Sequence, residues 1–280
     1  MAEGAGVTYP PRSLRVDGLN LRLVDEGQGP VVLLLHGFPD DHSVWRRQIA
    51  ALVAEGFRVI APDLRGCGES DLAPRVSDYR LPRLCADLDA LLEALQVPQV
   101  ALIGHDWGAV IGWHFAMRYP QRVSRYAALS VGHPQAYARG GLEQKLKGWY
   151  VLAFQLRGLI EWMLRARNWA LFRRLTAQPE EAPHWIERLR RPGRLTAAIN
   201  YYRANLGLLL LRRYPPVRMP VLGIWSDGDR FLTEAQMRAS ASLVEGPWRY
   251  ERVTSAGHWL QLEAPERVNA LLLGFLRSGV

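Results

Sequence analysis

Residues 100–113 read Val-Ala-Leu-Ile-Gly-His-Asp-Trp-Gly-Ala-Val-Ile-Gly-Trp, and this stretch decides the fold. An apolar run short enough for a buried strand ends at Gly104, and a run with helical spacing begins after Gly108. The two glycines leave room for a sharp turn from strand to helix, which would raise Asp106 above the sheet as a nucleophile. A carboxylate in that position can displace a leaving group from saturated carbon and form an ester on the protein.

Asp106 also has a structural interpretation, because Asp is a favoured N-cap and the helix dipole stabilises its charge. A catalytic role needs partners, and the candidates follow the last two predicted strands. Asp227 and Asp229 follow one of these strands, and His258 follows the other. Nucleophile, acid and histidine then occur in the chain order of a hydrolytic triad, in which the acid orients the imidazole that activates the attacking group. Three matches in this order favour catalysis over a structural role.

Length and composition describe a large globular chain. It has 280 residues, of which 49% are hydrophobic, enough to bury a sizeable core. No apolar run reaches the roughly 18–20 residues of a membrane span. The N-terminal Met-Ala-Glu-Gly-Ala-Gly lacks a basic region followed by an apolar stretch, so we expect no signal peptide and a cytoplasmic protein. Cys67 and Cys85 have no metal-ligand spacing around them, and we expect both to be reduced and no metal or cofactor to be bound.

The positive charge is concentrated in one segment. The chain has a formal net charge of +8, but residues 134–216 carry 13 Arg and 2 Lys against 5 Glu, or +10. No recognisable motif combines basic residues with stacking aromatics, so we expect no nucleic-acid partner. The segment could face anionic membranes, but we favour a solvated surface that reflects composition, because the chain has 33 Arg and only 2 Lys. Whether the chain forms a homodimer is left open by the sequence.

Strands and helices alternate along the first 120 residues. A hairpin is predicted around Asp17-Gly18, and apolar segments at 31–35, 57–61 and 100–104 have the composition of buried strands. Segments with helical periodicity separate them. This alternation predicts an α/β fold with a mostly parallel sheet flanked by helices.

A helical insertion interrupts the alternation. From Pro134 to Tyr214 the chain has helical periodicity and is rich in Trp, Leu and Arg, after which strand and helix patterns return. We therefore expect a helical cap over residues 134–216, inserted between core segments 1–133 and 217–280. Residues 1–10 are small or polar, and we expect them to be disordered.

With these motifs the chain resembles the α/β-hydrolase fold family and, within it, the epoxide hydrolases. The matching segments are His36-Gly37-Phe38-Pro39, Gly104-His105-Asp106-Trp107-Gly108, Trp225-Ser226-Asp227-Gly228-Asp229 and Gly257-His258-Trp259. The family pattern assigns the acid to the last residue of the third motif, Asp229. It also implies a cis peptide bond before Pro39 and an oxyanion hole formed by the backbone N–H groups of Phe38 and Trp107, which suits a tetrahedral ester intermediate.

Two cap tyrosines match contexts seen in epoxide hydrolases, Tyr150 within 149–155 and Tyr202 within 200–205. A tyrosine, with an unperturbed pKa near 10, can donate a proton to the epoxide oxygen at neutral pH. Neighbouring helical residues diverge by about 100°, so Tyr201 and Tyr202 cannot both face the cavity, and the family pattern selects Tyr202. Without that pattern, aromatic packing would be the expected role of these side chains.

The resemblance implies an enzyme that opens a small lipophilic epoxide to a vicinal diol with water and without a cofactor. Asp106 would form an alkyl ester, and water activated by His258 and Asp229 would hydrolyse it.

The alternative within the same fold is a haloalkane or haloacid dehalogenase that uses the same Asp106 nucleophile. Some dehalogenases share the sequence His-Asp-Trp-Gly and hold halide with the indole that Trp107 would provide. Haloalkane dehalogenases commonly carry a halide-binding Asn after His-Gly, and fluoroacetate-type dehalogenases usually have Arg in place of Trp107, so the motifs and the tyrosines favour the epoxide. A hydrolase-fold protein that only binds a ligand is the third interpretation, but it has no need of an intact triad.

Overall fold

The structure is a computed structural model that describes residues 9–278. Of the segment 1–10 predicted to be disordered, residues 1–8 lie outside the described part of the chain, as do residues 279–280. Between residues 9 and 278, no helix is long and apolar enough to cross a membrane.

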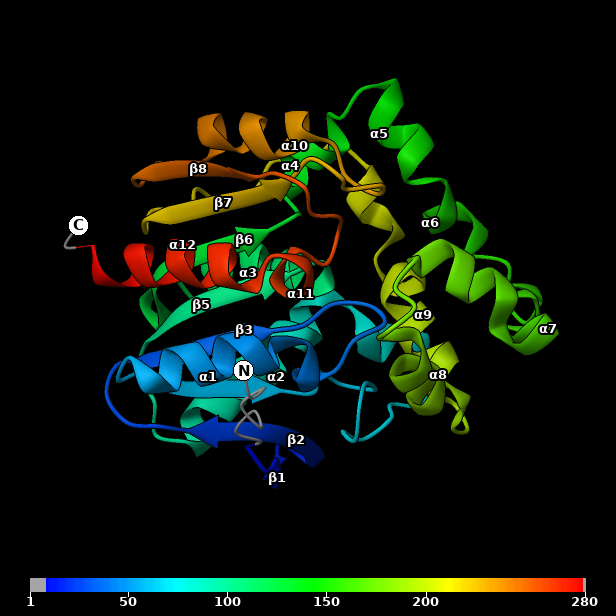
Figure 1. Cartoon of the computed structure of the whole chain (residues 1–280), viewed down its shortest axis with the longest axis horizontal. Coiled ribbons are helices and arrows are strands. Elements are labelled where there is room, and N and C mark those ends of the chain that lie inside the picture. Colours follow the sequence, from blue (N-terminus) through cyan, green and yellow to red (C-terminus); the bar gives the residue numbers. More distant parts are fainter. Residues whose placement is uncertain (1–8, 279–280) are drawn as a thin grey trace, which may run out of the picture.

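A central sheet of eight strands organises residues 9–278 (Figure 1). The strands lie in the order β1-β2-β4-β3-β5-β6-β7-β8. Those from β4 to β8 in this order are parallel. On the other side of β4, β2 pairs antiparallel with β4 and β1 pairs antiparallel with β2, so that β2 alone runs against the other strands. The predicted mostly parallel α/β sheet is therefore confirmed. The strand bounds are Arg12–Val16 (β1), Leu19–Glu26 (β2), Val31–Leu35 (β3), Arg58–Pro62 (β4), Val100–His105 (β5), Val123–Leu129 (β6), Val221–Ser226 (β7) and Trp248–Val253 (β8).

The inner strands β3 and β5 have almost no polar residues because helices cover both faces of the sheet. Every residue of β5 is buried, and so is every residue of β3 except Val31. At the opposite extreme, the predicted hairpin joins β1 to β2 at the edge. Its turn residues Asp17 and Gly18 have φ of 47° and 77°, as the two central residues of a type I′ hairpin turn require.

Helices pack on both faces of the sheet, with α1, α11 and α12 on the near face of Figure 1 and α2 and α3 on the far face. The sequence of α12 shows why it lies there: Val268, Leu271, Leu272 and Phe275 recur at helical spacing, and all are buried. The helix bounds in the core are Arg46–Ala54 (α1), Leu81–Ala94 (α2), Trp107–Arg118 (α3), Glu234–Ala239 (α10), Leu260–Glu263 (α11) and Pro265–Arg277 (α12), with short 3-10 helices at His42–Trp45 (η1), Val76–Tyr79 (η2), Pro120–Arg122 (η3) and Ser240–Leu243 (η5).

The helical cap is inserted between β6 and β7 and lies to one side of the sheet (Figure 1). Helical structure ends at Leu209, so the predicted helical pattern up to Tyr214 is wrong for residues 210–214. Pro215 and Pro216 follow directly, and proline disfavours helical backbone in the residues before it. The boundaries 134 and 216 stay predictions. The cap elements are Pro134–Ala138 (α4), Leu142–Lys147 (α5), Trp149–Ala153 (α6), Leu159–Thr176 (α7), Ala182–Arg190 (α8), Arg194–Ala204 (α9) and Leu206–Leu209 (η4).

The cap faces the carboxyl ends of the parallel strands. Asp106, Asp229 and His258 follow β5, β7 and β8, and in a parallel sheet these ends lie along one edge. Tyr150 and Tyr202 of the cap line the same cavities as Asp106. The fold therefore brings together five side chains that are up to about 150 residues apart in the chain.

Candidate active site

Asp106 occupies a strained turn between β5 and α3. Its φ of 51° and ψ of −121° lie in a region that residues other than glycine rarely adopt and that is concentrated at functional sites. The turn also requires glycine on both sides. A Cβ on Gly104 would overlap the backbone oxygen of Gly108, and a Cβ on Gly108 would overlap the backbone oxygen of Leu35. The two glycines thus allow α3 to pack directly on the sheet with Asp106 at its start.

The structure places His258 between two carboxylates. Its Nδ1 lies 2.9 Å from Oδ2 of Asp229, and its Nε2 lies 3.6 Å from Oδ2 of Asp106. The other oxygen of Asp229 accepts hydrogen bonds from the backbone N–H groups of Phe231 and Leu232, at 2.8 and 3.0 Å. These bonds fix the Asp229 carboxylate, which in turn fixes the imidazole.

The charges in this group shift the titration of all three side chains. Burial by itself lowers the pKa of His258, but the charges of Asp229 and Asp106 overcome this effect and raise that pKa to about 10. Burial likewise favours a higher pKa for Asp106 and Asp229, yet the adjacent imidazolium lowers the pKa of both below the usual value for Asp. At neutral pH the resting site therefore holds a cation between two anions.

The N–H groups expected to form an oxyanion hole lie beside the same carboxylate. The backbone N–H of Phe38 donates to Oδ1 of Asp106 at 2.8 Å, and the Phe38–Pro39 bond is cis. Trp107 is the first residue of α3, so its N–H belongs to the first helical turn, where backbone donors have no intrahelical acceptor.

Two cavities, of about 70 and 60 Å³, share Asp106, Tyr150 and Tyr202 as lining residues. The first continues toward α4 and η4, and the second continues toward α7 and includes His258. The rings of Tyr150 and Tyr202 lie edge to face, with centroids 5.9 Å apart. Both tyrosines therefore border the two cavities that reach Asp106.

The neighbouring Tyr201 points elsewhere, as the helical geometry predicts. Its hydroxyl donates to the backbone oxygen of Arg65 at 2.7 Å, and it lines neither of the two cavities. Burial raises the pKa of Tyr150 and Tyr202 well above the usual value, and the negative charge of Asp106 adds to this effect. Both hydroxyls consequently keep their protons at neutral pH and can act as donors.

Comparison with known proteins identifies the family. A family model described as alpha/beta hydrolase fold matches residues 30–265. The chain belongs to the α/β-hydrolase fold family. "Epoxide hydrolase 3" of Xenopus tropicalis is 32% identical over 95% of this chain and 77% of its own length, and "Epoxide hydrolase A" of Mycobacterium tuberculosis is 33% identical over 95% and 96%. The crystal structure of Bacillus megaterium epoxide hydrolase in complex with an inhibitor matches with a TM-score of 0.87 at 27% identity, over 95% of this chain and 100% of that one.

Residues that sequence reasoning missed surround His258 in this α/β-hydrolase. The ring of His105 packs against it at a tilt, with centroids 4.7 Å apart, and its Nε2 donates to the backbone oxygen of His258 at 2.9 Å. The ring of Phe231 packs against the imidazole with centroids 5.0 Å apart. Asp40 is buried nearby, where its Oδ2 accepts from the indole N–H of Trp259 at 3.2 Å. Each of the three lies within two residues of a predicted site residue, which is the signal that could have found them.

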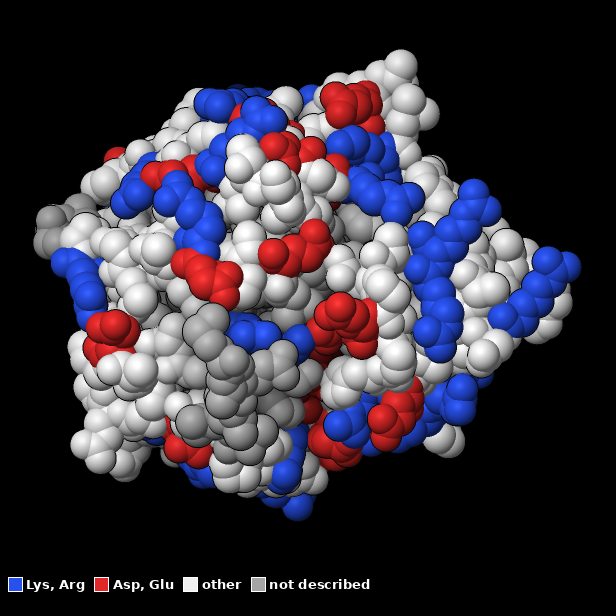
Figure 2. Space-filling view, in the orientation of Figure 1, with Lys and Arg blue, Asp and Glu red and all other residues white. Residues whose placement is uncertain are grey.

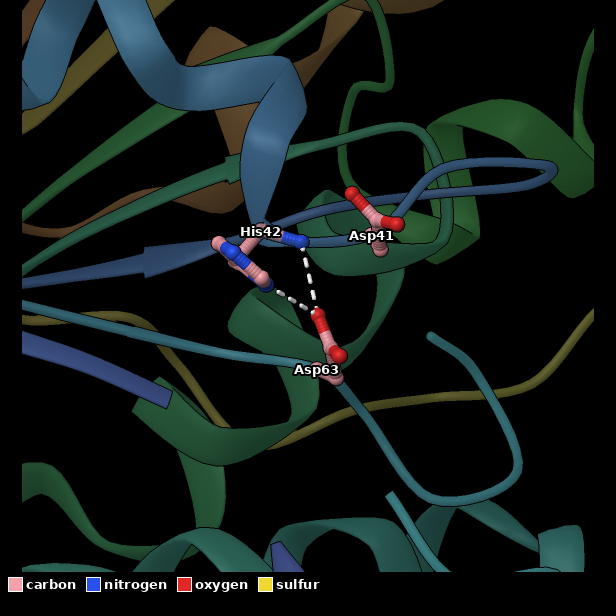
Figure 3. Close-up of side chains that lie close together, drawn as sticks. All are labelled: Asp41, His42 and Asp63. Carbon is pink, nitrogen blue, oxygen red and sulfur yellow. Dashed lines mark hydrogen bonds and ion pairs between the residues drawn. The ribbon is translucent and has the colours of Figure 1, made fainter. Parts of the chain in front are cut away.

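A second cluster of titratable groups lies outside the two cavities that Asp106 lines (Figure 3). Each of Asp41, His42 and Asp63 offers one potential metal-ligand atom, and these atoms lie within 4.8 Å of one another. Internal contacts already use them. Asp63 accepts from the backbone and the ring of His42 at 2.9 and 2.6 Å, and Asp41 accepts from Ser43 and from His184 of α8, each at 2.9 Å. The cluster therefore ties the cap to a core loop, and its geometry is explained without a metal.

Proposed function

We propose that this α/β-hydrolase is an epoxide hydrolase that converts a small lipophilic epoxide to a vicinal diol. The observation that carries the proposal is the shared position of Asp106, Tyr150 and Tyr202 on both cavities. Asp106 is a nucleophile for saturated carbon, and the two hydroxyls are donors for the oxygen that departs. Relatives named as epoxide hydrolases, at 32% and 33% identity, support the same chemistry.

In the first step Asp106 attacks a ring carbon. A bond forms between that carbon and a carboxylate oxygen, the ring carbon–oxygen bond breaks, and the ring oxygen takes a proton from Tyr150 or Tyr202. The Phe38 N–H holds Oδ1 of Asp106, which leaves Oδ2 for the attack. An epoxide oxygen would otherwise depart as an alkoxide, so these proton donors lower the barrier.

In the second step water hydrolyses the ester. His258, oriented by Asp229, takes one proton from the water as it attacks the ester carbonyl carbon. The acyl–oxygen bond then breaks, and the departing diol oxygen takes the other proton of that water, which returns Asp106 to a carboxylate. The protons balance because His258 starts the cycle protonated. Esterification removes the charge of Asp106, which lowers the pKa of His258, and the released proton restores the tyrosine.

Dehalogenation is the competing assignment, because the Trp107 side chain lines the same cavity as Asp106 and could hold a halide. Halide departs as a stable anion and needs only weak N–H donors. Dehalogenation would therefore give the paired tyrosines no role. A protein that only binds a ligand would have no use for the strained Asp106 turn and the fixed Asp229–His258 pair.

The deciding experiment assays the purified chain on terminal epoxides and on haloalkanes of similar size, and measures diol and halide separately. We expect the parent to form diol and to release no halide. Diol formation should be abolished in Asp106→Asn. Rapid halide release without diol formation would assign the chain to the dehalogenases. If Asp106→Asn kept the activity of the parent, the ester mechanism would be excluded.

A further inference from the structure

An apolar band lies on the exposed side of the cap. Its residues recur every three or four positions along α5, α6, the loop after α6 and the first half of α7, with an adjacent pair at Trp162 and Met163, and each is between 39% and 73% exposed. The band consists of Leu142, Leu146, Trp149, Leu152, Leu156, Leu159, Trp162 and Met163. Figure 1 shows α5, α6 and α7 along the outer side of the cap, away from the sheet.

The band differs from the rest of this molecule in how many large apolar side chains it exposes. Within residues 9–278, every exposed large hydrophobic side chain except Leu72 lies in the band, in η4 or in the two residues that follow η4. Monomeric proteins rarely expose contiguous apolar patches of this kind, and such patches mark interaction sites. Trp162, which is 68% exposed, would be a costly surface residue without a partner.

Basic residues without acidic partners accompany the band. Lys145, Arg157 and Arg165 are exposed and form no ion pair with any residue from 9 to 278. The acidic residues of the same helices are already neutralised: Glu143 lies 3.6 Å from Lys147, and Glu161 pairs with Arg203 of α9 at 2.7 Å. Figure 2 shows Lys and Arg side chains spread over this side of the molecule among uncharged residues.

The band also reaches the entrance of the candidate active site. Trp149 is 53% exposed as a member of the band, and it lines the cavity that contains Asp106 and His258. An exposed leucine of η4, Leu209, lines the other cavity. Exposed apolar residues of the cap thus also line both cavities that contain the nucleophile.

We propose that the apolar band docks the cap reversibly on an anionic phospholipid surface, with the cavity entrance facing the lipid. Apolar residues mixed with lysine, arginine and tryptophan are typical of segments that lie at a bilayer interface, where basic side chains meet lipid phosphates. The same charges argue against a second copy of this chain, because two caps with a net charge of +10 each would repel one another. The exposed leucines and tryptophans thus reverse the preference for a merely solvated surface.

The test is co-sedimentation of the full chain with phosphatidylcholine vesicles that contain or lack phosphatidylglycerol. We expect binding to the anionic vesicles at least about tenfold stronger than to the neutral ones, and weaker at high salt. Leu152→Gln/Leu156→Gln/Trp162→Gln should lose binding at any salt concentration, because it removes the apolar contribution. Arg157→Gln/Arg165→Gln should lose the preference for anionic vesicles.

Two control variants lie outside the band. Arg15→Gln/Arg47→Gln removes the same charge from exposed arginines of the core that form no ion pair within the described residues, and Leu72→Gln removes an exposed leucine of the core. Both should bind anionic vesicles as the parent does, and thermal melts should show that all variants are folded. Phospholipids brominated in the acyl chain should quench part of the tryptophan fluorescence of the parent, and Trp162→Gln should remove part of that quenching.

Three results would overturn the proposal. The first is equal binding of the parent to neutral and anionic vesicles. The second is binding of the band variants that is as strong as that of the parent. The third is a parent that is dimeric in solution while the band variants are monomeric. The last result would mean that the band is an interface between copies of the chain. None of these outcomes depends on the reaction catalysed. The vesicle experiments therefore test the docking proposal independently of the proposed epoxide hydrolase activity.

Discussion

The Nε2 atom of His258 lies 3.6 Å from Oδ2 of Asp106, close enough for strong attraction but too far for a good hydrogen bond. This spacing leaves Oδ2 of Asp106 without a close hydrogen bond to the imidazole. It also makes the charge on Asp106 one cause of the raised pKa of His258, which is about 10 in the resting state. An imidazole with such a pKa is a poor base, so in the proposed cycle it becomes an effective base only after Asp106 is esterified.

The first prediction concerns this coupling. Asp106→Asn removes a negative charge next to the imidazole and should therefore lower the pKa of His258 by about 1–3, the usual effect of one opposite charge at this distance. NMR titration of the labelled imidazole measures this pKa directly. Asp227→Asn is the matched control, because Asp227 bonds the backbone N–H of Ser255 at 2.9 Å and does not contact His258. If the pKa of His258 were unchanged in Asp106→Asn, the charge of Asp229 alone would account for its raised value.

The second prediction is a covalent intermediate on Asp106. His258→Gln removes the base for hydrolysis but leaves the nucleophile and the tyrosines, so the alkyl ester should accumulate. Mass spectrometry of the intact variant and of the peptide that contains Asp106 should show the added mass of the epoxide.

The control for this trapping experiment is Asp106→Asn/His258→Gln, which should carry no added mass. Single-turnover hydrolysis by the parent in oxygen-18 water is an independent check. Label found in the Asp106 carboxylate supports the ester, whereas label found only in the diol excludes it.

Features with a local signal in the sequence were predictable. The strand expected at 31–35 is Val31–Leu35, and the strand expected at 57–61 is Arg58–Pro62, because apolar runs are local properties. The turn at Asp106 was predictable because two glycines flank it at the required spacing. The choice of Tyr202 over Tyr201 needed the family pattern, since helical geometry says only that the two side chains diverge.

Features that depend on distant packing were not predictable in this way. His105 supports His258 across 153 residues of chain, and although its place beside Asp106 marks it as a neighbour of the site, the local sequence does not show that it contacts His258. The apolar band is the clearer case. Leucines and tryptophans at helical spacing normally predict a buried helix face, but Trp162 and Leu152 are exposed because no other segment among residues 9–278 covers them. Burial of a helix face is decided by what packs on it, which the helix sequence does not specify.

The third prediction concerns the glycines that allow the turn at Asp106. In Gly108→Ala the new Cβ meets the backbone oxygens of Leu35 and His36, so the variant should lose at least about 1–3 kcal/mol of stability through overpacking. Gly274→Ala in α12 is the control. Its Cβ would meet no atom within 4 Å, and alanine should stabilise that helix by about 0.5–1 kcal/mol. Urea unfolding midpoints measure both changes, and a Gly108→Ala variant as stable as the parent would contradict the close packing of α3 on β3.

The last prediction separates the two candidate chemistries through the cap tyrosines. Tyr150→Phe or Tyr202→Phe should each slow ring opening moderately, because the remaining hydroxyl lines the same cavities and can still donate. The double variant should lose far more, since proton donation to a departing oxygen is typically worth roughly 10²–10⁴ in rate and an unassisted alkoxide would then form in a largely apolar cavity. Single-turnover measurement of the ester on Asp106 isolates this step from hydrolysis.

Tyr201→Phe is the matched control for the double tyrosine variant. It removes a neighbouring hydroxyl that bonds Arg65 at 2.7 Å and lines neither cavity, so it should cost about 0.5–1.5 kcal/mol of stability and leave ring opening unchanged. Any halide displacement should survive the double change, because halide needs no proton to leave. Full epoxide activity in the double variant would show that Tyr150 and Tyr202 are packing aromatics and that another group protonates the oxygen. Equal losses in Tyr201→Phe and Tyr202→Phe would assign the effect to cap stability, because only one of these hydroxyls can reach the substrate.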